Sequence, residues 1–208
     1  MTRIMTFLAL LIASLLSAQN DYKADMQHAL SLWEDGKTAV AVKEFEAIAT
    51  VFTSEWLPNY YVALLTAQEA LMESDNRELM KSLLEKAQRY QDLVNRVELE
   101  NAEVLVIQAL INTGWIIYNP LINGPKLSAD VAYLYKRANE LSPENPRVHL
   151  NKTNYEIGAA KYFGQDTSSL CEQYNKTLTL FANFKPKSEI EPNWGFNQAR
   201  ALLAECIK

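Results

Sequence analysis

Glycine and proline are scarce in this chain, with 6 and 7 residues among 208. Few turn-forming residues imply long secondary-structure elements, which favours helices. Alternating runs of β-branched residues joined by Asn-Gly turns are nearly absent, so a sheet protein is excluded. Asn123-Gly124 is the one Asn-Gly pair, and no alternating runs flank it. The length fits one domain with enough chain to bury a sizeable core.

Histidine is almost absent, and so are the motifs of common enzymes. His28 and His149 are the only two, and neither has a His or Cys three or four residues away. A metal site needs three or four ligands, so no metal and no cofactor is predicted. Phosphate-binding loops, nucleophile elbows and His-Glu-x-x-His helices are missing as well. The sequence therefore predicts a protein that is not an enzyme, with an uncharacterised hydrolase kept as an alternative.

Cys171 and Cys206 are the only cysteines. An even number in an exported chain favours a disulfide, which would join residues 35 positions apart (206 − 171). Two buried free thiols are the alternative. A redox role is not predicted because no Cys-x-x-Cys occurs.

The amino terminus has the pattern of a signal peptide. Arg3 precedes an apolar run from Ile4 to Leu16 that is too short to span a bilayer, and Ala18 suits cleavage before Gln19. An uncleaved anchor is the alternative. We predict a signal peptide at 1–18, a single domain at 19–208 and an exported protein, periplasmic or secreted, with no membrane span after cleavage.

Acidic residues outnumber basic ones. The mature chain would carry 19 basic and 25 acidic residues, a net charge of −6. The two signs are interspersed without a basic run, which argues against nucleic acid as a partner.

Apolar residues recur at helical spacing along the mature chain. In Ser128–Leu141 they form one face, Ser128 is a candidate cap, and Pro143 marks the end. Similar segments pair into four helical hairpins and a final capping helix: 21–35 with 38–52, 56–72 with 76–95, 101–118 with 128–141, 148–163 with 168–184, and then 194–207. Hairpins of this kind bury their apolar faces by stacking, so we predict an all-α solenoid.

The hairpins resemble tetratricopeptide repeats. Gly36, Ala41 and Phe45 stand in the order of the turn glycine, the small residue and the aromatic residue of that motif. Tyr135 and Ala138, followed by Pro143, repeat its later part. The whole chain is also similar to small exported tetratricopeptide-like proteins of Bacteroidetes.

Two regions are candidates for function. Residues 119–126 look like an apolar loop inserted between two helices, and such a loop could cover a core edge or form a lid. The second region is a set of amide and aromatic residues on first helices, which would line the concave face of a solenoid and could recognise a peptide or a glycan. The candidate binding residues are Tyr60, Gln68, Gln108, Asn112, Trp115, Tyr118, Asn151, Asn154 and Tyr155.

The favoured function is an interaction or scaffold module of the cell envelope. Its partner would be an envelope protein or peptide bound on the concave face, with Trp115 and Tyr118 as aromatic anchors. The alternative is a small-molecule or glycan binder with a pocket under the 119–126 loop. The sequence does not fix the oligomeric state.

Overall fold

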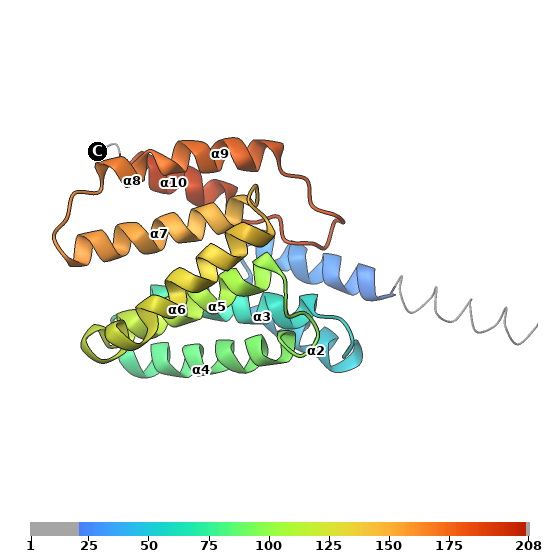
Figure 1. Ribbon diagram of the computed structural model, residues 1–208. Coiled ribbons are helices and arrows are strands. Elements are labelled where there is room, and N and C mark those ends of the chain that lie inside the picture. Colours follow the sequence, from blue (N-terminus) through green and yellow to red (C-terminus); the bar gives the residue numbers. More distant parts are fainter. Residues whose placement is uncertain (1–20, 207–208) are drawn as a thin grey trace, which may run out of the picture.

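Helices make up all the regular secondary structure of residues 21–206, the part of the chain that the computed structural model describes. The predicted signal peptide lies outside this range. A first helix covers residues 21–34. It is followed in chain order (Figure 1) by α2 (Thr38–Val51), α3 (Leu57–Met72), α4 (Arg77–Val94), α5 (Ala102–Tyr118), α6 (Pro120–Leu141), α7 (Pro146–Tyr162), the short α8 (Ser168–Cys171), α9 (Gln173–Asn183) and α10 (Phe196–Cys206).

Local chemistry sets the helix boundaries. Four helices begin after an asparagine whose side-chain oxygen accepts a backbone N–H of the first turn, which satisfies a donor without a partner in the helix. These caps are Asn76 for α4, Asn101 for α5, Asn119 for α6 and Asn145 for α7. Gly36 follows the end of the first helix, and its φ of +77° is a conformation that suits glycine just past a helix carboxyl end.

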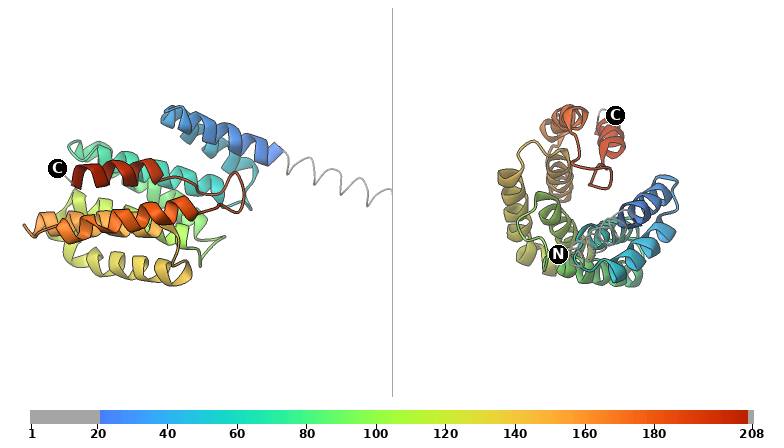
Figure 2. Two further views of the ribbon diagram at one scale, coloured as in Figure 1. Left: turned by 90° about the horizontal axis from the view of Figure 1, so that it is seen from above. Right: turned by 90° about the vertical axis from the view of Figure 1, so that its right-hand side faces the viewer.

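The helices pack as the predicted hairpins. The first helix lies beside α2 (Figure 2). In the same way α3 pairs with α4, α5 with α6, and α7 with α9, while α10 packs against α8 and α9. Seen along the helices, they follow one another around an open arc, with the first helix and the carboxyl-terminal helices at its two ends (Figure 2, right). One large core cluster extends through the first helix and α2 to α7. The predicted all-α, solenoid-like fold is therefore confirmed.

The predicted loop at 119–126 is wrong. Only Asn119 separates α5 from α6, and residues 120–126 form the first turns of α6. Asn119 caps α6 through the N–H of Ile122, and Pro120 suits the first position because it needs no N–H partner there. Ser128 is therefore inside α6 and is not its cap; its hydroxyl donates to the carbonyl of Gly124.

Residues 184–195 form an irregular segment between α9 and α10, which we call the strap. Ile190 and Trp194 are buried in the main core cluster together with residues of α3, α5 and the first helix. Glu189 of the strap forms an ion pair with Lys23 of the first helix at 2.8 Å. The same carboxylate accepts a hydrogen bond from Gln27 at 2.7 Å. The strap therefore connects the carboxyl-terminal helices with the amino-terminal hairpin.

The carboxyl-terminal helices have a small core of their own. Leu150 and Ile157 of α7 pack with Cys171, Tyr174 and Ala199. Cys171 and Cys206 are joined, so the predicted disulfide is present and ties α10 to α8. Among residues 21–206, no helix is both long and apolar enough to cross a membrane.

Reducing the disulfide, or replacing both cysteines with serine, should lower the free energy of unfolding. The bond closes a step of 35 residues, for which the chain-entropy model gives roughly 3–4 kcal/mol. Urea unfolding with and without a reductant would measure this difference. A change below about 1 kcal/mol would show that the unfolded chain gains little freedom when the bond is broken.

Candidate functional site

A buried ion pair joins the amino-terminal ends of α5 and α7. Arg147 Nε donates to both oxygens of Glu103 at 2.8 and 2.9 Å, and both side chains are almost completely buried. The same carboxylate accepts from Asn145 at 2.6 Å and from the Tyr60 hydroxyl at 3.2 Å. The Phe184 ring of the strap covers the guanidinium, with 4.3 Å between the guanidinium carbon and the ring centroid.

Tyr60 lies in this network and does not line an open groove. It is fully buried, and its hydroxyl accepts the indole N–H of Trp194 at 2.9 Å. The neighbouring Tyr61 donates to the carbonyl of Ile190 at 2.9 Å. The strap therefore covers the inner surface that we expected Tyr60 to offer to a ligand.

Burial raises the pKa of Tyr60 and Tyr61 well above the usual tyrosine value, and the Glu103 carboxylate raises both further. Each hydroxyl is thus held in its neutral form, which can donate a hydrogen bond. The two tyrosines serve the packing of the strap.

The candidates on α7 also have partners within the protein. Asn151 is buried and donates to the carbonyl of Arg147 one turn earlier. Asn154 accepts from the Tyr174 hydroxyl at 2.6 Å, and Tyr155 is half-buried beside Tyr135, with 6.1 Å between the ring centroids. Gln68 on α3 is half-buried.

The remaining four candidates come together on α5. Gln108 exchanges two hydrogen bonds with Gln88 of α4, at 2.9 and 3.1 Å, and donates a third to Asn112. Trp115 lies one turn further along α5, and its ring meets that of Tyr118 edge to face, with 5.6 Å between centroids. Sequence spacing alone placed these residues on one helix, but it gave no sign of the contact with α4.

A hollow of about 340 Å³ opens at this place. Trp115 lines it from α5, and Glu85, Gln88, Arg89 and Asp92 line it from α4. We call it the α4–α5 hollow. The Asn123 side chain of α6 donates to the backbone carbonyl of Trp115, but none of the residues that line the hollow belongs to α6. The pocket that we predicted under residues 119–126 therefore stays a prediction.

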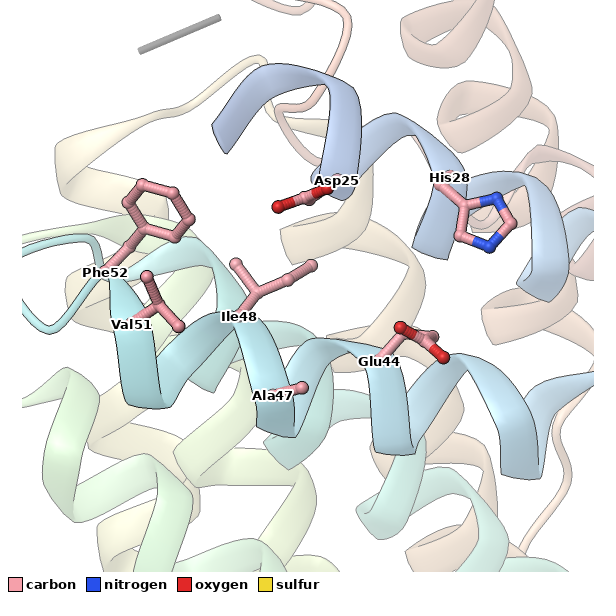
Figure 3. A pocket seen from close by; sticks show the side chains of 7 residues that line it. All are labelled: Asp25, His28, Glu44, Ala47, Ile48, Val51 and Phe52. Atoms are coloured by element: carbon pink, nitrogen blue, oxygen red, sulfur yellow. The ribbon is translucent and has the colours of Figure 1, made fainter. Parts of the chain in front are cut away.

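A smaller cleft of about 180 Å³ lies between the first helix and α2. Figure 3 shows Asp25 and His28 from the first helix on one side. On the other side lie Glu44, Ile48 and Val51 of α2, together with Phe52 just after its end. In the described part of the chain, no three His, Cys, Asp or Glu side chains are grouped so that they could hold a metal ion. This cleft therefore combines carboxylates and an imidazole without forming a metal site.

The whole fold is similar to that of a solved haemophore, HusA from Porphyromonas gingivalis. The TM-score is 0.74, the sequences are 21% identical, and the match covers 89% of this chain and 92% of that chain. No protein-family model and no curated protein matches the chain. At this identity the likeness shows the fold, and the resemblance to tetratricopeptide repeats stays a prediction.

Removing one partner of the buried ion pair should be strongly destabilising. Arg147→Met leaves the Glu103 carboxylate buried without its cation, which should cost about 3–5 kcal/mol. Replacing both residues with apolar ones should cost less than Arg147→Met alone, because no buried charge is then left. Urea unfolding of the two variants would measure this, and a double variant less stable than the single one would contradict the interpretation.

Alkaline pH should weaken the strap. The folded-state pKa of Tyr60 and Tyr61 lies above the unfolded value of 10.0. The stability that they contribute is complete below about pH 10 and is lost as the pH rises above it. Thermal unfolding from pH 8 to 11 should therefore show a falling midpoint, with a shallower fall in Tyr61→Phe. Equal slopes would show that Tyr61 does not contribute.

Proposed function

We propose that this protein is an exported binder of a flat, largely apolar small molecule of the haem class. The observation that carries the proposal is the fold likeness to a haemophore over nearly the whole of both chains. The α4–α5 hollow adds one flat aromatic side chain, that of Trp115, beside the polar residues of α4.

A protein or peptide scaffold fits the structure less well. In a solenoid an extended peptide would bind on the concave face, but here the strap packs against α3 and the first helix on the inner side of the arc. Tyr60, Tyr61, Ile190 and Trp194 are buried against one another there. We therefore propose the function that the sequence analysis gave as the alternative, a binder of a small molecule.

Export completes this proposal. The pattern of residues 1–18 indicates a signal peptide, and the disulfide of Cys171 with Cys206 is compatible with an oxidising compartment. We propose a periplasmic or secreted location. We also propose that the stacked hairpins are tetratricopeptide-like repeats. No catalytic activity is part of the proposal.

Haemin titration of the mature, disulfide-bonded chain tests the function. We expect a saturable shift of the haemin absorbance at one ligand per chain, with a Kd of about 1 µM or tighter for a ligand that fits a pocket of this kind. A maltooligosaccharide followed by calorimetry is the comparison for a glycan binder. Absence of haemin binding, or binding of the sugar alone, would contradict the proposal.

A further inference from the structure

The strap, which joins α9 to α10 in Figure 1, covers aromatic side chains on the inner side of the arc. We propose that the strap is a lid that can leave this surface, and that the rings of Tyr60 and Tyr61 beneath it then bind the flat ring of a haem-class ligand. This inference rests on the proposed function and adds to it the site and the segment that controls access to the site.

Side chains of α2 and of the start of α3 hold the rings of Tyr60 and Tyr61 in place. The two rings meet edge to face, with 5.2 Å between their centroids. Phe45 of α2 stacks on Tyr61 at 4.9 Å, and Trp56, which precedes the first turn of α3, meets Tyr60 edge to face at 5.3 Å. None of these partners belongs to the strap, so the aromatic surface keeps its supports when the strap leaves. Because aromatic rings gain from stacking beyond the area that they bury, this surface favours a flat aromatic ligand.

The strap meets the two tyrosines with the kinds of group that such a ligand carries. The indole N–H of Trp194 donates to the Tyr60 hydroxyl at 2.9 Å. The backbone carbonyl of Ile190 accepts from the Tyr61 hydroxyl, also at 2.9 Å. A haem-class molecule has a flat ring in place of the indole, and the oxygens of its acid groups can accept from Tyr61 in place of the carbonyl. The strap therefore acts as an internal competitor for the site.

Opening the strap would remove negative charge from this surface. Glu189 and Glu191 both belong to the strap and would leave with it. The negative charge of Glu191 contributes to the raised pKa of Tyr61, and Glu189 is paired with Lys23 of the first helix. The Glu103 carboxylate stays, but it is paired with Arg147. An acidic ligand would thus meet less repulsion at the open surface than at the closed one.

The strap can detach without unfolding a helix. Within residues 185–194 the structure has one backbone-to-backbone hydrogen bond, from the N–H of Glu191 to the carbonyl of Ser188 at 3.2 Å. The bond between Cys171 and Cys206 keeps α10 beside α8, so both ends of the strap stay in place when its middle leaves. Irregular segments with few backbone hydrogen bonds are among the parts of a protein that open locally.

Burial of Ile190 and Trp194 opposes this opening, so the open form is a minor one. The apparent Kd of a ligand that binds only the open form equals its intrinsic Kd divided by the open fraction. A change that loosens the strap should therefore tighten binding, and a change that locks the strap should weaken it. A purely structural strap would move affinity in neither direction.

The test measures haemin affinity in mature, disulfide-bonded chains whose strap is loosened or locked. Glu189→Ala loosens the strap, because it removes the ion pair with Lys23 and the hydrogen bond from Gln27. Gln27→Cys/Glu189→Cys lets a short bifunctional maleimide join the strap to the first helix, and the native cysteines do not react because they are bonded to each other. Asp35→Ala is the matched control, since Asp35 is about as exposed as Glu189 and is paired with a lysine, Lys37, outside the strap.

We expect Glu189→Ala to bind haemin about two- to fivefold more tightly than the wild type, the factor that an exposed ion pair contributes to the closed form. Asp35→Ala should bind as the wild type does. The cross-linked chain should bind about tenfold more weakly or worse, whereas the same chain before cross-linking should bind as Glu189→Ala does. Thermal melts first establish that each protein is folded.

Three results would overturn the lid while leaving the proposed function in place. They are unchanged affinity after cross-linking, binding by Glu189→Ala that is no tighter than that of the wild type, or a gain in Asp35→Ala as large as that in Glu189→Ala. If neither the wild-type chain nor Glu189→Ala binds haemin, the proposed function itself fails.

Discussion

The ion pair between Glu103 and Arg147 is the constraint on which the arrangement of the inner helices depends. Each residue lies in the first turn of its helix, α5 or α7. The helix dipole favours the carboxylate there and disfavours the cation, so the arginine needs the glutamate beside it. Tyr60, in the first turn of α3, donates to the same carboxylate, so the amino-terminal ends of three helices meet there. This network fixes how α3, α5 and α7 align.

The strap follows from that network. A polar cluster facing the inner surface of the arc would be open to water, and water would weaken its hydrogen bonds. Phe184 covers the guanidinium of Arg147. Trp194 donates to the hydroxyl of Tyr60, which itself donates to the Glu103 carboxylate. The chain thus closes the inner surface of the arc with its own residues.

The sequence predicted the fold well and the site only in part. Helical spacing of apolar residues was enough to predict the hairpins, because each helix buries one face. It could not show that 184–195 packs into the arc, since an irregular segment has no period. Two asparagine caps are each followed two positions later by a charged residue, Glu103 in one case and Arg147 in the other. These opposite charges at two helix starts were the available sign of the ion pair. Asn119-Pro120 was likewise the sign that α6 begins there, because an asparagine cap and a first-position proline favour a helix start.

A closed inner surface also affects how an outer hollow can bind. Trp115 rests on the same core that contains the strap, and the amides of Gln88, Gln108 and Asn112 are already bonded to one another. The amides and the indole of this surface are therefore held in place, whereas Glu85, Arg89 and Asp92 beside them are exposed.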